Sequence, residues 1–349
     1  MRSTILIAIL VAGLPIGARV LLAHHSFAPH FDRNRPVSIT GTIVRYEARN
    51  PHSYLHIAAV DENGRTQEYV CESHGFTQLR RIGLTPELLR AGTRLTVTGS
   101  ASKHSAYMCF FDSVELEDGR TLSVNAPSAP GASGRPAGAR RTEIFGTWLL
   151  APMPNRSTSG PQPMMESLTP AGERAVAAYD PFRDDPTFRC DPVAVRRVWG
   201  APSTPLEIVR RGGDVVLRHE WMDVERVVHM GMDTHPPDGT FGSLGHSIGR
   251  FEGDTLVIET AYYAGGVLSQ YVEEAGQPTK GLLHSAALTT VERLRVDAER
   301  QRLVVEIDHA DPEFFTRPFS TVTREFSPSN LSLEPFDCSR EGPTGLIRE

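Results

Sequence analysis

Alternating apolar and polar residues mark short strands along the first third of the chain. Residues 36–47 are rich in β-branched side chains and predict a strand, residues 52–60 predict a second one, and a turn at 61–64 leads into a third. Thr85 and Pro86 are typical of a helix start. The other segments predicted here are strands at 66–72, 94–100 and 107–116, helical pieces at 76–82 and 86–90, and a short return after 118. This order is that of an OB-fold barrel.

The second half of the chain shows one helical segment and then a long series of short strands. Residues 167–179 predict a helix that Thr169 caps. Gly146-x-Trp148 at the head of the region resembles the start of lipocalin-type folds, which gives an expectation for the architecture only. The predicted strands are 206–210, 215–219, 225–230, 255–263, 287–296, 302–308 and 320–326. The pattern predicts a mostly β protein, with a larger antiparallel barrel or curved sheet after the OB-like one.

The hydrophobic start and a linker divide the chain into four parts. Arg2, the apolar run 3–18 and Ala23 have the order of a secretory signal. The alternative is an uncleaved membrane anchor, which Arg19 and the polar segment after residue 23 disfavour. The predicted parts are a signal peptide (1–23), an OB-like domain (24–124), a Pro/Gly/Ala-rich linker (125–142) and an antiparallel β domain (143–349). We therefore expect a periplasmic or secreted protein with no stable membrane span after cleavage.

The composition limits the classes of binding partner that we expect. The 349 residues are 40% hydrophobic and 22% charged, with a net charge of −6 and no block of lysine or arginine. Nothing in this balance predicts nucleic-acid binding. A small-molecule ligand or a protein partner is compatible with it.

Four cysteines in an exported chain predict disulfides. Two precede the linker and two follow it, so the simplest pairing is Cys71–Cys109 and Cys190–Cys338. The alternative for the first pair is a zinc site, because Cys71-x-x-His74 and His104-x4-Cys109 have the spacing of zinc ligands.

Histidines concentrate where the predicted signal ends. Cleavage after Ala23 would give His24 a free α-amine, and His25, His30 and Asp32 follow closely. Amine and imidazole nitrogens in this arrangement suit copper, with zinc as the alternative. His52 and His56 are four residues apart on one predicted strand, which places their imidazoles ~13 Å apart. Only one of these two can therefore join the group. The candidate ligands are His24, His25, His30, His52 and His56. Alternatively the stretch is a solvated terminus, which Phe27 and Phe31 anchor on the barrel.

The second domain carries its own group of candidate acid–base residues. They lie in or near two polar segments and could line the mouth of a barrel: His229, Asp233, His235, His246 and Glu252. The run Gly245-His246-Ser247-Ile248-Gly249 has the spacing of a nucleophile elbow. An elbow needs a strand–turn–helix context, whereas strands are predicted on both sides of this run, so we exclude a serine hydrolase.

Two resemblances cover most of the chain. The motifs His24-His25-Ser26-Phe27, Gly41-Thr42-Ile43 and Asn50-Pro51-His52 resemble those of a family of small exported bacterial proteins. The run from Gly245 to Leu256, with Cys190-x-Pro192 and the closing Cys338, resembles a second group of exported bacterial proteins. Neither family has an established activity. The resemblance therefore implies export and two modules but assigns no site residue.

Three functional hypotheses follow from the sequence. The first is an exported binding protein with a copper site at its mature N-terminus and a small apolar or amphipathic ligand in the second barrel. The second is an enzyme that uses the acid–base residues of the second domain. The third is an accessory or scaffold protein without a site of its own. The ligand, any reaction and the oligomeric state stay open.

Overall fold

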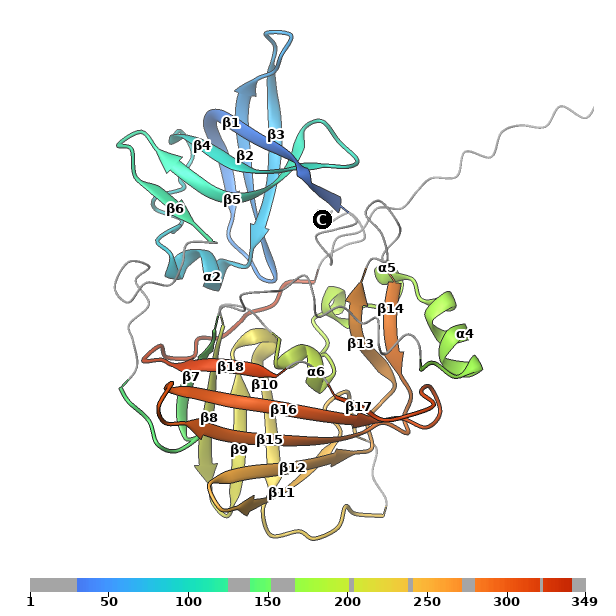
Figure 1. Cartoon of the computed structure of the whole chain (residues 1–349). Helices are drawn as coiled ribbons and strands as arrows, with labels where there is room; N and C mark the ends of the chain where they lie inside the picture. The colour runs from blue at the N-terminus through green and yellow to red at the C-terminus, as the bar shows by residue number, and fades with distance from the viewer. Residues whose placement is uncertain are drawn as a thin grey trace, which may run out of the picture.

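The computed structural model describes residues 30–124, 139–151, 167–200, 204–237, 241–271, 280–320 and 323–340. The predicted signal peptide and residues 125–138 of the predicted linker lie outside these ranges. Figure 1 shows a smaller barrel beside a larger one, with the last described segment of the chain running between them. The prediction of a mostly β protein, with a small OB-like barrel followed by a larger β structure, is confirmed.

The first sheet closes into an OB-like barrel. Its strands lie in the order β3-β2-β1-β4-β5, and β5 returns to pair in parallel with β3. The strands are β1 (Phe31–Glu47), β2 (His52–Val60), β3 (Thr66–His74), β4 (Arg94–Ser102), β5 (Met108–Leu116) and the short β6 (Thr121–Ser123), which pairs with β5. The five strands β1 to β5 therefore form the closed ring that the predicted OB-like strand order requires.

Close packing inside the first barrel explains two features of its sequence. Gly41 lies within β1, where a Cβ would come within 2.4 Å of the Ala58 carbonyl oxygen on β2. Cys71 and Cys109 are opposite each other on β3 and β5 and form a disulfide in the core. The predicted pairing is confirmed. The zinc alternative is wrong, because both sulfur atoms are consumed by the bond.

The short segment between β3 and β4 holds one helix rather than two. The predicted first piece is α2 (Phe76–Arg81). The predicted second piece, residues 86–90, forms only turns, in which the Leu89 amide donates to the Thr85 carbonyl. A single such bond does not propagate into a helix.

The second sheet is a closed barrel of nine strands within the described residues. Its order is β15-β12-β11-β10-β9-β8-β7-β18-β16, and β16 pairs back to β15. The strands are β7 (Gly146–Leu150), β8 (Pro205–Arg211), β9 (Asp214–His219), β10 (Val224–His229), β11 (His246–Glu252), β12 (Thr255–Ala261), β15 (Thr289–Asp297), β16 (Arg302–Ala310) and β18 (Arg324–Pro328), with β17 (Phe319–Ser320) paired beside β16. Of the two predicted alternatives, the barrel is confirmed.

Three details of the second domain differ from the prediction. The β10–β11 pair is parallel, so the barrel is not antiparallel throughout. A separate hairpin, β13 (Gly266–Tyr271) with β14 (Lys280–His284), lies outside the ring. Besides the predicted helix α4 (Pro170–Ala178), capped by Thr169, the described chain contains the short helices α5 (Pro181–Asp184), α6 (Val195–Val198), η1 (Pro186–Arg189) and η2 (Trp221–Asp223). None of the helices in the described residues is long and apolar enough to span a bilayer.

Large side chains and one ion pair occupy the interior of the second barrel. Trp148 and Trp199 are fully buried, and the Trp199 indole donates to the Glu292 carboxylate at 2.6 Å. Arg226 donates to both oxygens of the same carboxylate, at 2.7 Å for one of the two bonds. The void beside Trp199 and Arg226 has a volume of only about 10 Å³. This part of the interior therefore leaves no room for the small ligand expected in the barrel.

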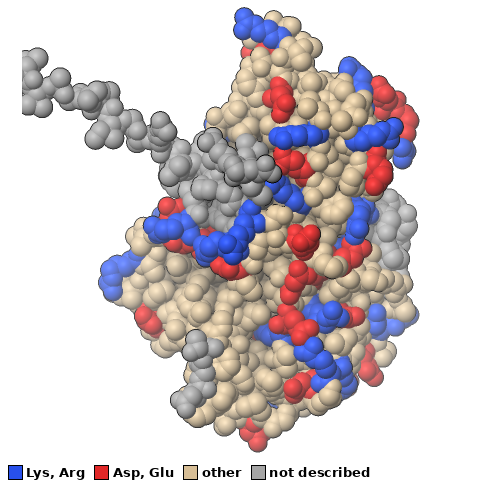
Figure 2. Space-filling model, turned by 180° about the vertical axis from the view of Figure 1, so that it is seen from behind, with Lys and Arg blue, Asp and Glu red and all other residues tan. Residues whose placement is uncertain are grey.

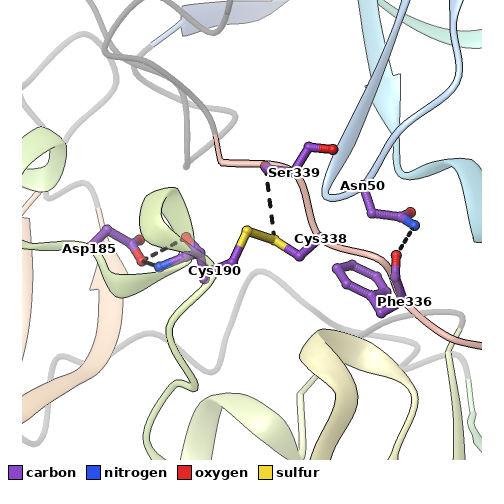
Figure 3. The surroundings of a disulfide bond; sticks show 7 residues. Asn50, Asp185, Cys190, Phe336, Cys338 and Ser339 are labelled. Carbon is purple, nitrogen blue, oxygen red and sulfur yellow. Dashed lines mark hydrogen bonds between the residues drawn. A yellow bond between two sulfur atoms is a disulfide. The ribbon is translucent and has the colours of Figure 1, made fainter.

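The last described segment of the chain joins the two barrels. Cys338 forms the predicted disulfide with Cys190, and the Ser339 amide donates to the Asn50 carbonyl at 2.8 Å. The Asn50 side chain donates to the Phe336 carbonyl, as Figure 3 shows. Its amide oxygen also accepts from the Thr77 amide and hydroxyl, each at 3.2 Å. Asn50 of the Asn-Pro-His motif thus has a structural role at the domain junction.

Replacing Asn50 by alanine should lower the free energy of unfolding by about 1–3 kcal/mol, because buried groups on both barrels lose their partner. Urea denaturation followed by circular dichroism measures the loss. Asn63→Ala is the control, since Asn63 lies in an exposed turn. Equal stabilities of the two variants would contradict the role that we assign to Asn50.

A buried ion pair adds to the same junction. Arg81 of α2 donates to both carboxylate oxygens of Glu220, which follows β9 in the second barrel. The Glu220 side chain is fully buried and also accepts from the Glu334 amide of the last segment, at 3.0 Å. Burial raises the pKa of Glu220, and Arg81 opposes this rise. One carboxylate therefore holds α2, the second barrel and the final segment together.

Candidate functional site

Three histidines of the second barrel lie together at the parallel strand pair β10–β11. His229 ends β10, His246 begins β11, and His235 comes from the connection between these two strands. The parallel register pairs His229 with Ile248 on β11. We call His229, His235 and His246 the three-histidine cluster.

The imidazole rings of this cluster are in direct contact. The Nδ1 atoms of His235 and His246 are 2.8 Å apart. The His229 ring stacks on His246, with ring centroids 5.0 Å apart and an angle of 19° between the planes. Asp214, at the start of β9, contacts His229 Nδ1 at 3.2 Å and also accepts from the Met230 amide.

Two aromatic side chains border the cluster. Phe241 contacts His246 with a centroid distance of 5.0 Å, and Tyr262 contacts His235 at 5.8 Å. Phe241 and Tyr262 also stack on each other. They make one side of the cluster apolar, while Tyr262 stays partly open to solvent at 41% exposure.

Burial lowers the pKa of both His235 and His246. For His246 the neighbouring His229 and His235 lower the pKa further, because a second positive charge in the cluster would be repelled. Both rings are therefore neutral near pH 7, which leaves nitrogen lone pairs available to accept a proton or to bind a metal.

The other two candidate acid–base residues of this domain lie on the surface. Asp233 is exposed, and exposed Glu252 pairs with Arg250 at 2.9 Å. Ser247 is within β11 and bonds to Thr260 at 2.9 Å, so a strand surrounds the Gly-His-Ser-x-Gly run. Within the described ranges, no three His, Cys, Asp or Glu side chains are arranged to surround a metal ion. His229 stacks on the face of His246 instead of pointing between His246 and His235.

The first barrel holds a second group of histidines near the start of β1. His30 is buried, and its ring lies 5.8 Å from that of His104. The His30 carbonyl accepts from the Lys103 amide at 2.7 Å, which fixes the backbone of this segment beside the end of β4. The next residue, Phe31, is buried and packs against Phe110 of β5. His30 and Phe31 are thus docked on the barrel.

The two remaining described ligand candidates of the first barrel have different surroundings. His56 is buried, with one ring nitrogen 2.9 Å from Glu47 and the other 2.8 Å from Glu68. The pKa of His56 is lowered, mainly because the ring is buried. Both nitrogens have carboxylate partners, and Arg45 lies 2.9 Å from one of them, so His56 is part of a network of polar and charged side chains. Its role as a ligand in the predicted metal site stays a prediction. His52 lies beside Glu72, at 3.7 Å, and opposite His74. His24 and His25 lie outside the described residues.

An open groove lies on the first barrel. It has a volume of about 470 Å³ and is bordered by Tyr69 and Tyr107, whose rings meet edge to face, and by Asp61, Glu62 and Arg35.

Figure 2 shows that lysine, arginine and acidic side chains are intermixed over the face of the molecule opposite to that in Figure 1. That face therefore does not present one large area of a single charge.

Comparison with known proteins bears on the first barrel. Residues 14–109 match the model of a family of unknown function (DUF6152). The match includes the histidine-rich stretch and β1 to β4, in agreement with the resemblance of the N-terminal domain to an uncharacterised family. No curated protein matches the chain. The resemblance of the second domain to another exported group stays an expectation.

Several residues of these sites were not predicted from the sequence. His104 was assigned only to the zinc alternative, yet the β1–β4 pairing places it beside His30. The OB-like strand order contains that pairing and would have indicated this contact. Asp214, Phe241 and Tyr262 had no local signal, because each reaches the three-histidine cluster from a different strand or connection.

Proposed function

We propose that the protein is an exported binding protein that holds a transition-metal ion through histidines at the start of the first barrel. Copper is our first choice, and zinc is the alternative. The observation that supports this proposal is the burial of His30 against His104 at the point where the chain enters β1. A terminus exposed to solvent would leave His30 accessible.

The chemistry of the side chains fits the proposed ion. Imidazole nitrogens are common ligands of copper and zinc. The described residues offer His30 and His104, and His24 and His25 come shortly before them in the sequence. His24 would add an α-amine nitrogen if the signal is cleaved after Ala23. Two disulfides are compatible with an exported protein, since disulfides persist in oxidising compartments.

The mature protein, purified from the export compartment, should bind Cu(II) at this site, and His104→Ala should weaken that binding at least ~10-fold. Loss of a nitrogen ligand is the physical reason. Competition against glycine, followed by electron paramagnetic resonance, measures the affinity and the nitrogen ligation. Thr98→Ala is the control, because Thr98 is exposed on β4, the strand that precedes His104.

A second variant tests the contribution of the terminus. One residue added before His24 removes the α-amine from chelating distance and should abolish the high-affinity binding. Equal affinity of the extended and native forms, with no effect of His104→Ala, would disprove the proposal. The His52→Ala variant reports separately whether His52 is a further ligand.

A further inference from the structure

The three-histidine cluster of the second barrel offers chemistry that the proposed site in the first barrel does not use. Its central contact is a hydrogen bond between two Nδ1 atoms, 2.8 Å apart, of His235 and His246. Such a bond requires that one imidazole carries a proton on Nδ1 and that the other presents its lone pair there. One proton thus lies between two nitrogen lone pairs. A metal cation that replaces this proton must lie beside the line between the two nitrogens, because roughly 2.0 Å to each of them cannot be reached on that line.

The separation of the two nitrogens matches the spacing of neighbouring ligands on a tetragonal ion. Metal–imidazole bonds are roughly 2.0 Å long, so two nitrogens at right angles around one ion lie about 2.8 Å apart. Tetragonal nitrogen coordination is typical of Cu(II) and Ni(II). The observed 2.8 Å between His235 and His246 matches this separation, so the two rings need to turn toward the ion but not to move apart.

The fold holds both rings in place before any ion arrives. His246 is buried at the first position of β11, directly after Gly245. A Cβ on Gly245 would come within 2.6 Å of the Ala261 carbonyl oxygen, so the strand approaches β12 closely at this point. His229 stacks on the His246 ring and is itself oriented by Asp214. Tyr262 contacts the edge of His235.

We propose that His235 and His246 form a chelating site for a tetragonal transition-metal ion, Cu(II) in the first place. His229 and Asp214 are positioning residues, because His229 stacks on the His246 ring and Asp214 contacts His229. The remaining coordination positions of the ion are open to water or to an external ligand. This site is separate from the one in the first barrel and does not rest on it.

The test uses the full mature chain carrying His104→Ala, which weakens the first-barrel site. Titration with Cu(II), in competition with glycine, should show one bound ion with nitrogen hyperfine structure in its electron paramagnetic resonance spectrum. Adding His235→Ala or His246→Ala should lower the affinity at least ~100-fold, because a chelate loses one of its two arms. Asp233→Ala is the control, since Asp233 is exposed in the same connection.

Asp214→Asn tests the positioning role. It should weaken Cu(II) binding several-fold and change the spectrum of the bound ion, whereas a merely structural residue would leave the spectrum unchanged. The proposal is overturned if the His104→Ala protein binds no Cu(II), or if it binds Cu(II) with the same affinity after His235→Ala and His246→Ala. In those cases the pair only shares a proton. Loss of the first-barrel site alone leaves this proposal standing, so the two proposals fail separately.

Discussion

Replacing Glu292 by glutamine should lower the free energy of unfolding by about 3–5 kcal/mol. The Glu292 side chain is fully buried inside the second barrel, and Arg226 beside it is almost as buried. Glutamine keeps an oxygen that can accept from the Trp199 indole, but it leaves the Arg226 guanidinium charged and without a counter-ion. Urea denaturation of the full chain, monitored by tryptophan fluorescence, measures the loss.

An exposed ion pair on the same strand supplies the control for this variant. Arg293, the next residue of β15, pairs with Asp308 at 2.7 Å while both side chains are about half exposed. Arg293→Gln should therefore change the stability by less than about 1 kcal/mol. Similar losses for Glu292→Gln and Arg293→Gln would show that the buried pair is not the main electrostatic support of the barrel.

Removal of the Cys190–Cys338 disulfide, by serine at both positions, should destabilise the second domain by about 5 kcal/mol in the chain-entropy description. The bond closes a loop with a sequence separation of 148 residues, which the unfolded chain would otherwise explore freely. The same change should release the last described segment from the domain junction. Hydrogen exchange of the Phe336 and Ser339 amides, which donate to Asp223 and Asn50, measures that release.

The other disulfide is the matched comparison. Cys71 and Cys109 are 38 residues apart, so serine at both positions should destabilise by about 4 kcal/mol, within the first barrel. This second double variant should leave the exchange of the Phe336 and Ser339 amides slow. Unchanged exchange in the Cys190→Ser/Cys338→Ser protein would show that Asn50 and Glu220 hold the segment without the disulfide.

The first barrel was largely predictable because its signals are local. Alternating β-branched residues mark the strands, and the turn before β3 marks a hairpin. The disulfide pairing followed from the position of the linker between two pairs of cysteines. The turns at 86–90 were predicted as a helix, because Thr85 and Pro86 start a helical turn and nothing local shows that it ends there.

The second barrel was less predictable where strands are rich in polar residues. The sequence of β11 combines His246 and Ser247 with charged residues near its end, so it read as a polar loop. Its Arg250 and Glu252 are on the exposed part of the strand and pair with each other. The hairpin of β13 and β14 was also missed. Pairings between strands distant in the sequence, such as β7 with β18, have no local signal at all.

The candidate sites show the same division between local and long-range information. Sequence clustering identified His229, His235 and His246, and the structure brings these three together. It could not show that Glu252, at the other end of β11 from His246, is exposed and pairs with Arg250, since that depends on where the side chain leaves its strand. For His56, the carboxylates of Glu47 and Glu68 come from the strands on either side, and only the register between strands reveals both.

The parallel strand pairs of the two barrels are a consequence of parity. Each antiparallel pair reverses the strand direction, and a closed ring returns to its starting direction only after an even number of reversals. Within the described residues the rings contain five and nine strands, so each must include a parallel pair: β3–β5 in the first and β10–β11 in the second.

Parallel neighbours in turn cannot be joined by a tight hairpin and need a long crossover. In the second barrel the connection from β10 to β11 is residues 230–245, and its His235 contacts His246. The odd number of strands therefore creates the connection on which the proposed chelating site depends. A related barrel with an even number of strands could close by hairpins alone, and it would have no such connection.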